Sequence, residues 1–217
     1  MITNRDIQII ETIKEFRILS SSQIQRLFNI SKYICSRRMI EITNNIKEIK
    51  VKRYNPINNV YDNKYKGILK NENIYYYKKK PSAIVHDLLV NEFYLKLLEI
   101  DDFNVKEFKK EYRISMDDEF VVRADAYILL EIEGKEYEFL LEVENNKSFN
   151  NYKYSKLMEQ GYVPLPIIVS TDRRIYNNNL EIIRVKLSQD DTKNKLKQYI
   201  LEQNFGYKIN KKTLKKG

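Results

Sequence analysis

The sequence is poor in the residues that form disulfides and zinc sites. It has one cysteine, Cys35, one histidine, His86, and no tryptophan. A single cysteine cannot form an internal disulfide, and one cysteine with one histidine leaves almost no material for a zinc site. Any bound metal is therefore expected to be a hard cation with oxygen ligands. Because Cys35 lies in an apolar-periodic segment, we interpret it as a core residue rather than a nucleophile.

Glycine, proline and long apolar runs are also scarce. With 5 Gly and 4 Pro among 217 residues, the composition argues against long flexible linkers. No apolar run approaches the roughly 18 residues of a membrane-spanning helix, and the start MITNRDIQII lacks the apolar region of a signal peptide. We therefore expect a soluble cytoplasmic protein without a membrane partner.

Charge is abundant but unevenly distributed. Residues 1–80 carry 17 Lys and Arg against 7 Asp and Glu, whereas residues 81–200 carry 17 against 22 and residues 201–217 carry 5 against 1. The overall net charge is +9. A basic first unit before an acidic one favours a polyanionic partner for residues 1–80. A generic basic surface is the alternative.

Apolar spacing in residues 1–80 predicts three helices and a β-hairpin. Thr3, Ser20–Ser22 and Ser31 are expected to cap the helices. The expected inward-facing residues are Ile7, Ile10, Ile13 and Phe16, then Ile24, Leu27 and Phe28, then Ile34, Cys35, Met39 and Ile42. IKEIKVKRYN alternates as a half-buried strand does, and its expected partner is NENIYYYKKK at 71–80. This order predicts a winged helix-turn-helix domain.

A winged helix of this charge is expected to bind double-stranded DNA, because its third helix fits the major groove. The residues expected to read bases are Lys32, Ser36, Arg37 and Arg38, and those expected to contact phosphates from the wing are Lys52, Arg53, Lys64 and Lys66. DNA binding of this kind needs no cofactor. The alternative is a winged helix used for protein contacts.

Residues 81–205 predict a second domain, and 206–217 a basic tail. A helix from SAIVHDLLVNEFYLKLLEI is followed by strands at about 104–114, 119–133 and 137–144. A helix at 150–160 and a buried strand in PLPIIVS come next, then a strand at 181–187 and a last helix that Gly206 is expected to end. The chain is thus expected to have an α+β or α/β two-domain fold, with a mixed-sheet αβββαβ second domain.

The expected hairpin turn is Gly134-Lys135, of type II′. Glu133 would then face Glu136, Asp125 would face Glu144, and Tyr127 would face Glu142. The other face would pair Ala126 with Val143, Ile128 with Leu141 and Leu130 with Phe139. Asp125, Glu142 and Glu144 would share one face, and such a cluster needs a cation, either Mg²⁺ or a basic side chain.

Two structural interpretations, without a metal, compete with a metal site. Arg123 lies two residues before Asp125 and so would share its face, where it could neutralise the carboxylates without any metal. His86 lacks a second His or Cys ligand, so a structural role is the simpler interpretation.

The order helix, three strands, helix, strand, with Asp125 and Glu142-Val-Glu144, resembles the PD-(D/E)xK nuclease core. The resemblance implies that Asp125 and Glu142 hold Mg²⁺ or Mn²⁺ and that Glu92 assists from the helix. This sequence departs from the motif, because Glu144 stands where the motif has its lysine. Lys153 or Lys156 would have to supply that ammonium. An active site of this kind would make the protein a nickase or endonuclease using Asp125, Glu142, Glu144 and Lys156.

Most of the chain resembles the plasmid replication-relaxation proteins. The segments that carry this resemblance are TNRDIQIIETIKEFRILSSSQIQRLF, VHDLLVNEFYLKL, VRADAY, FLLEVENN and YSKLMEQGY, with His86, Asn91, Arg123, Asp125, Glu142 and Lys156 at the motif positions. It implies a nucleoid- or plasmid-associated bacterial protein that acts in the replication or transfer of a plasmid, phage or integrative element. Its partners would include that element's replication or transfer proteins, and a homodimer would suit a palindromic site. A transcriptional repressor of the same element is a further alternative.

Overall fold

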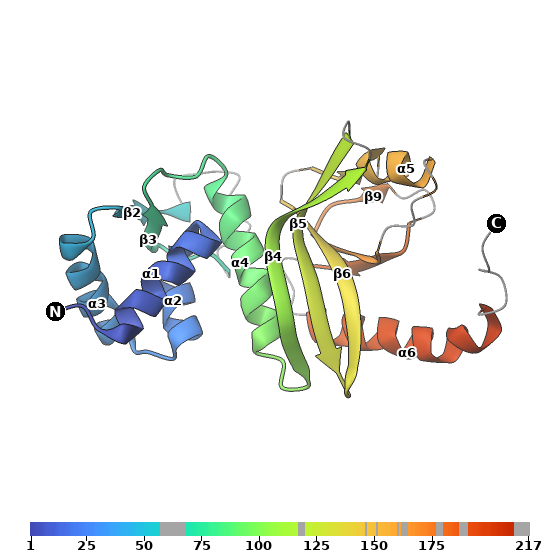
Figure 1. Ribbon diagram of the computed structural model, residues 1–217, viewed down its shortest axis with the longest axis horizontal. Helices are drawn as coiled ribbons and strands as arrows, with labels where there is room; N and C mark the ends of the chain where they lie inside the picture. Colours follow the sequence, from blue (N-terminus) through green and yellow to red (C-terminus); the bar gives the residue numbers. More distant parts are fainter. Residues whose placement is uncertain are drawn as a thin grey trace.

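The protein has an α+β fold in which helices accompany a small antiparallel sheet and a larger mixed sheet. The computed structural model describes residues 1–56, 68–116, 120–145, 147–150, 152–159, 161, 165–176, 180–186 and 191–210. The N-terminal helices and the end of α6 lie at opposite ends of the longest axis (Figure 1). None of the helices in this part of the chain is both long and apolar enough to cross a membrane.

The N-terminal unit contains the three expected helices and two expected strands. These elements are α1 (Asn4–Phe16), α2 (Ser21–Phe28), α3 (Lys32–Asn45), β2 (Ile49–Tyr54) and β3 (Glu72–Tyr77). Their caps are Thr3, Ser20 and Ser31, each accepting a hydrogen bond from a backbone N–H of the first turn. Serine and threonine stabilise helix starts in this way, which is why the starts were predictable.

Two details of this unit differ from the expectation. A short strand, β1 (Ile18–Ser20), pairs with β3 and completes a sheet of order β1-β3-β2. Its three residues are all buried, so it has no alternating pattern to recognise. In α1, Ile7 is half exposed and Ile9 is buried instead, so the buried stripe is rotated around the helix relative to the expected one.

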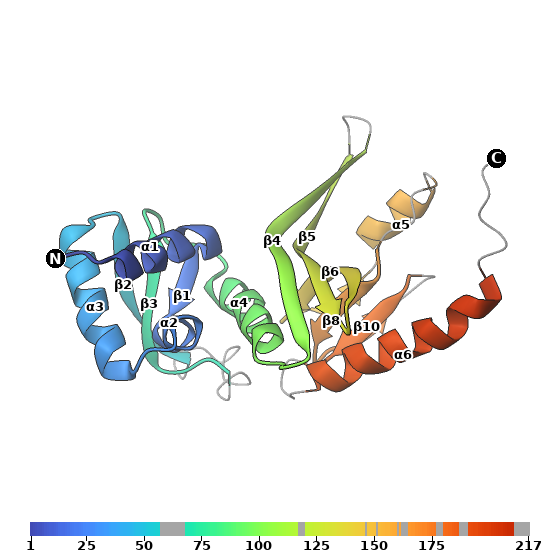
Figure 2. The ribbon, with the colours of Figure 1, turned by 60° about the horizontal axis from the view of Figure 1, so that its bottom comes forward.

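Helix α4 (Ile84–Leu98) stands between the two sheets (Figures 1 and 2). One continuous apolar cluster joins Ile18 and Ile74 of the small sheet to Leu89 and Phe93 of α4. Asn91, which is fully buried, donates from Nδ2 to the Ile18 carbonyl at 2.5 Å. The N-terminal unit is therefore packed on the rest of the chain through α4 rather than tethered by a linker.

The larger sheet has the order β10-β8-β6-β5-β4. Its strands are β4 (Phe103–Met116), β5 (Phe120–Ile132), β6 (Lys135–Glu144), β8 (Ile167–Thr171) and β10 (Ile182–Val185). β4, β5 and β6 are antiparallel, whereas β6, β8 and β10 are parallel. The strands that were expected in this part of the chain are all present.

Helices cover both faces of this sheet. α4 and α6 (Thr192–Asn210) pack against one face, and α5 (Tyr152–Glu159) packs against the other. A two-stranded parallel sheet of β7 (Phe149–Asn150) and β9 (Ile175–Tyr176) lies beside α5. The expected end of the last helix at Gly206 is wrong, because α6 continues through it to Asn210. A helical glycine costs only about 1 kcal/mol relative to alanine.

The predicted hairpin register is also wrong. The turn is Glu133-Gly134, both with positive φ (52° and 76°), and Ile132 pairs with Lys135. This fits a type I′ turn, in which both central residues need positive φ. The observed pairs are Ala126 with Leu141, Ile128 with Phe139 and Leu130 with Tyr137. The β6 residue that pairs with each residue of β5 therefore lies two positions earlier in the sequence than expected. A shift of two positions leaves every side chain on the same face of the sheet.

Strand β5 changes face around Asp125. Ala124 packs in the α5-side core and Ala126 in the α4-side core, although residues two apart on a regular strand share a face. On β4, Glu111 lies between the partners of these alanines and has a φ of 51°. A non-glycine residue with positive φ inside a strand is strained, and such strain is concentrated at functional sites.

Candidate nucleic-acid interface and acidic cluster

The outward face of α3 carries a stripe of four side chains at helical spacing. Tyr33, Ser36, Arg37 and Ile40 are all exposed, with Tyr33 at 73% and Ile40 at 63%. The Arg37 guanidinium lies over the Tyr33 ring, 5.9 Å from its centroid. Lys32 is exposed in the first turn of the same helix. This exposed stripe combines apolar, hydroxyl and guanidinium groups, and a face that only contacts water does not require exposed apolar side chains.

Tyr33 and Ile40 were not among the residues expected to contact DNA. Only polar and basic residues of this helix were expected to contact bases or phosphates, and apolar residues were expected in the core. The available signal was spacing: positions 33, 36, 37 and 40 lie on one face at i, i+3, i+4 and i+7. The inward positions 35, 39 and 42 are buried as expected.

Arg38, which was expected to face outward, is held inside the N-terminal unit. Its Nε donates to Asp6 Oδ1 at 2.8 Å, a second bond from Nη2 reaches Asp6 Oδ2, and Nη2 also donates to the Met1 carbonyl at 3.0 Å. Asp6 is fully buried, and although burial acts to raise its pKa, the bonds from Arg38 and Thr3 hold that pKa at about 2. Arg38 therefore fixes α3 to the start of α1 and is not part of the outward face.

The exposed part of the small sheet lies on its edge strand, β2. Four consecutive residues of β2 are exposed, including Lys50, Lys52 and Arg53. Arg53 donates to the side chain and the carbonyl of Asn71, both at 2.8 Å, which directs it along the hairpin. Lys64 and Lys66 lie outside the described residues.

Asp125 is the centre of a second cluster on the larger sheet. Its Oδ2 accepts a hydrogen bond from the Val143 backbone N–H at 2.7 Å, just beyond the last paired residues of β5 and β6. The same oxygen lies 3.1 Å from His86 Nε2 on α4. Burial lowers the pKa of His86, but the hydrogen bond and charge of Asp125 outweigh it, so the net pKa is raised. His86 thus contacts the cluster.

Glu142 is the most buried carboxylate of this cluster. The Tyr154 hydroxyl donates to its Oε1, and Lys153 Nζ lies 2.6 Å from the same atom. Burial and the charge of Asp125 raise the pKa of Glu142 to about 7, against the opposing effects of Lys153 and Tyr154. Both partners come from α5, so the helix supplies the cation and the proton donor that this acid requires.

Glu144 is half buried beside these acids. Burial and the Asp125 charge raise its pKa, and the charges of Lys153 and His86 act in the opposite direction. The Asp125 charge thus acts on both Glu142 and Glu144, so the three acids that were expected to lie near one another interact despite the register error. Lys153 Nζ also donates to the Arg123 carbonyl at 3.0 Å. The backbone of Lys156 lies in α5.

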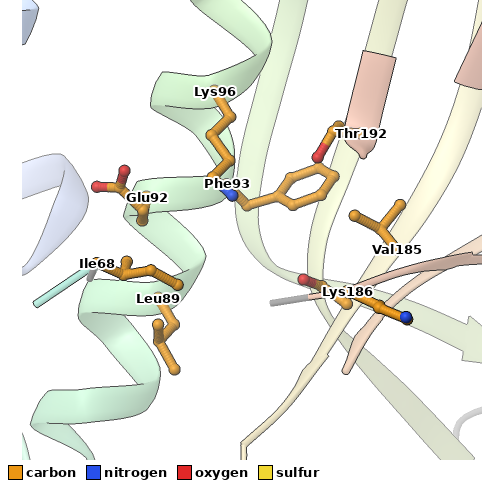
Figure 3. Close-up of a pocket in the computed structure, with 9 residues that line it drawn as sticks. Ile68, Leu89, Glu92, Phe93, Lys96, Val185, Lys186 and Thr192 are labelled. Carbon is orange, nitrogen blue, oxygen red and sulfur yellow. The ribbon is translucent and has the colours of Figure 1, made fainter. Parts of the chain in front are cut away.

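Two other predicted members have different partners. Glu92 forms an ion pair with Arg26 of α2 at 2.6 Å, and in Figure 3 its carboxylate points away from Val185 and Thr192, toward which the Phe93 ring lies. Arg123 is exposed, and its nearest acid is Glu111 at 3.9 Å. The cation beside the acids is therefore Lys153, not Arg123.

Asp125 and Glu142 have the chemistry of ligands for a hard divalent cation, because two carboxylates that are shielded from solvent repel one another and carboxylate oxygens suit Mg²⁺ or Mn²⁺. In the described residues, however, no three His, Cys, Asp or Glu side chains are arranged to hold a metal ion together. The positive charge next to Glu142 is the Lys153 ammonium.

Comparisons with known proteins add no family to this geometry. No family model matches the chain, and no curated protein matches it. Function is therefore inferred from the residues themselves.

Proposed function

We propose that this protein binds double-stranded DNA and that α3 enters the major groove. The N-terminal unit would then be a winged helix-turn-helix, with the β2–β3 hairpin as its wing. The observation that carries the proposal is the exposed stripe Tyr33, Ser36, Arg37 and Ile40 on a helix whose opposite side is buried. An α-helix has the width that the major groove accepts.

Each side chain of the stripe has a role suited to a base edge. Arg37 can donate two hydrogen bonds to guanine O6 and N7, Ser36 can bond to several bases, and Ile40 can contact a thymine methyl group. Lys32, Lys52 and Arg53 would contact phosphates, which position the protein without reading sequence. The excess of positive charge in residues 1–80 supports the same partner.

Selection from a random duplex pool at physiological salt tests this function for any target sequence. We expect the wild-type protein to enrich a short motif over several rounds. Arg37→Ala should lose or change that motif. Arg174 is an exposed arginine outside the N-terminal unit, so Arg174→Ala should keep it. Enrichment of no motif by the wild-type protein would contradict sequence-specific binding.

The second candidate function is a divalent-metal-dependent DNA nickase or endonuclease. The observation that favours it is the convergence of Asp125, Glu142 and the Lys153 ammonium, which together match the groups of a PD-(D/E)xK site. Asp125 and Glu142 would hold the metal, which would polarise a phosphate and activate water. Lys153 rather than Lys156 would then supply the ammonium that the motif lacks at Glu144.

Cleavage assays with Mg²⁺ and Mn²⁺ on duplex, single-stranded and branched DNA test this candidate. An active enzyme should lose cleavage in Asp125→Asn and Lys153→Met while retaining DNA binding, and Glu159→Gln on the exposed side of α5 should leave it unchanged. Without cleavage of any substrate, the cluster has a structural or DNA-contacting role instead.

The biological setting that we propose comes from the resemblance to plasmid replication-relaxation proteins. In that setting the protein acts in the replication or transfer of a mobile element, together with other proteins of the element. A repressor of the element would use the same α3 face. Placing the selected motif upstream of a reporter gene, or in the origin of a test plasmid, separates the two: a repressor lowers reporter expression, whereas a replication factor changes plasmid copy number.

A further inference from the structure

A basic groove lies between the end of α1 and the connection from β3 to α4. It has a volume of about 340 Å³. The groove is lined by Lys14, Arg17, Tyr77, Lys79, Lys80, Pro81 and Ser82. Four of these seven residues are cationic and none is acidic. The groove is separate from the α3 face and from the acidic cluster.

The cations of the groove differ in how far they are neutralised. Lys14 pairs with Glu11 at 2.6 Å, and Arg17 pairs with Glu111 at 2.5 Å. Lys79 and Lys80 are exposed, and neither forms an ion pair with any residue that the structure describes. Two positive charges in the groove are thus left to an external anion.

The chain segment that lines the groove lies, in sequence, between the N-terminal unit and the helix that contacts the acidic cluster. The β3–α4 connection that carries Lys79 and Lys80 begins at the wing strand and leads directly into α4, where His86 contacts Asp125. On the opposite wall, Arg17 is paired with Glu111, which itself lies 3.9 Å from Arg123.

The Arg123 end of this path reaches the acids. Its carbonyl accepts a hydrogen bond from Lys153 Nζ at 3.0 Å, and the same ammonium lies on Glu142. A chain of polar contacts therefore runs from the groove to the acidic cluster.

We propose that this groove binds the sugar–phosphate backbone of the same DNA that α3 reads, through Lys79 and Lys80, and directs the flanking DNA toward the acidic cluster. The proposal rests on the DNA-binding function proposed above. Lysine ammonium groups suit phosphates as mobile point charges, and they carry no sequence information. The groove would extend the contact beyond the bases that α3 reads.

Salt-dependent DNA binding tests the groove. Fluorescence anisotropy would compare the wild-type protein with Lys79→Gln/Lys80→Gln on the selected duplex and on a random duplex. Each lost phosphate contact lowers the slope of log K against log salt by about 0.9. We expect the slope to fall by about 1 to 2 and affinity for both duplexes to fall by the same factor. The control, Lys186→Gln/Lys195→Gln, removes two exposed charges from the C-terminal unit and should behave as wild type.

A tethered cleavage reagent locates the DNA directly. Cys35 is buried and burial raises its thiol pKa to about 11, so a Ser82→Cys variant can be labelled selectively with iron–EDTA. We expect backbone cleavage at a fixed position flanking the selected motif, and none from the same label at Lys195→Cys on α6.

The outcomes separate the groove from the proposed function. If the wild-type protein and Arg37→Ala behave as predicted but the Lys79/Lys80 variant keeps the wild-type slope, or if the label at position 82 cuts no DNA, the groove proposal is overturned alone. If inorganic phosphate binds the groove but the Lys79→Gln/Lys80→Gln variant binds DNA as the wild type does, the groove binds small anions only, and the proposal is also overturned. Absence of any DNA binding by the wild-type protein overturns both.

Discussion

At the scale of single residues, buried charged groups hold the N-terminal unit in position. Lys110 of β4 donates to the Phe16 carbonyl at 2.8 Å and to Asn91 Oδ1 at 2.7 Å. Burial lowers the pKa of this amine to about 8. Asn91 also bonds to Ile18, so a single lysine and a single asparagine connect α1, β1, α4 and β4. Asn91, one of the motif positions named above, thus has a structural role here.

The lowered pKa of Lys110 predicts a pH dependence of stability. Below pH 8 the amine is protonated in both the folded and the unfolded chain, so its burial penalty is constant. Between pH 8 and about 10.5 the folded chain releases the proton first, so the free energy of unfolding should rise with pH, by at most on the order of 3 kcal/mol.

Urea unfolding at pH 7.5 and 9.5 measures this effect by comparison with Lys110→Met, which cannot titrate. The wild-type protein should gain stability relative to the variant as the pH rises, because tyrosines and other groups contribute equally to both. Equal pH dependence in the two proteins would show that Lys110 is not desolvated.

Arg37 and Arg38 are adjacent but should respond differently to substitution. Arg38→Met leaves the buried Asp6 carboxylate without its cation, so it should lower the free energy of unfolding clearly. Arg37→Met removes an exposed side chain and should change stability by less than about 0.5 kcal/mol. Chemical denaturation of both variants is the measurement. Equal stability of the two would mean that the Arg38–Asp6 pair is solvated and weak.

At the scale of elements, the β5–β6 hairpin has an unfavourable residue in its turn. Glu133 adopts a φ of 52°, a conformation that asparagine tolerates better. Glu133→Asn should create the preferred Asn-Gly turn and stabilise the protein by about 0.5 to 1 kcal/mol. Glu133→Ala removes the same charge without favouring positive φ, so the difference between the two variants in urea unfolding isolates the backbone effect. No difference would argue against the type I′ turn.

The elements themselves were largely predictable, because their signals are local. Serine and threonine caps marked the N-terminal helices, and a continuous apolar run marked β8 of the larger sheet. The hairpin register was not predictable from glycine alone, since Gly134 fits the first position of one turn type and the second of another.

The candidate site was predictable only in part. Asp125, Glu142 and Glu144 were expected to lie near one another, and the Asp125 charge does act on both glutamates. The partners Lys153 and Tyr154 depend on how α5 packs over the sheet. Arg38 points inward because it bonds to the buried Asp6, which lies thirty-two positions earlier in the sequence. Such tertiary pairings leave no periodic signal.

At the scale of the whole molecule, the two units share a core. Residues 1–80, expected to form the first domain, contact α4 closely. Gln23 of α2 donates to the Leu88 carbonyl of α4 at 2.9 Å, and Arg26 pairs with Glu92 and Glu99, both at 2.6 Å. Helix α3, which we propose to bind DNA, is thereby fixed relative to the acidic cluster, as the proposed path of DNA along the groove requires.

This shared core predicts one cooperative unfolding transition for the whole chain. Calorimetry should give a single peak with equal calorimetric and van't Hoff enthalpies. A fragment of residues 1–80 should be much less stable than the same residues in the full chain, since Ile18 and Ile74 would lose their α4 neighbours. Two resolved transitions, or a fragment as stable as the intact protein, would instead indicate independent domains.

The central claim is that α3 reads DNA sequence, and one ratio tests it most directly. That ratio is the affinity for the selected duplex divided by the affinity for a random duplex, measured at physiological salt for the wild-type protein and for Arg37→Ala. We predict that the ratio falls by about 5- to 100-fold in Arg37→Ala, because a bidentate base contact contributes about 1–3 kcal/mol of discrimination. An unchanged ratio, or a wild-type ratio of one, would contradict the claim.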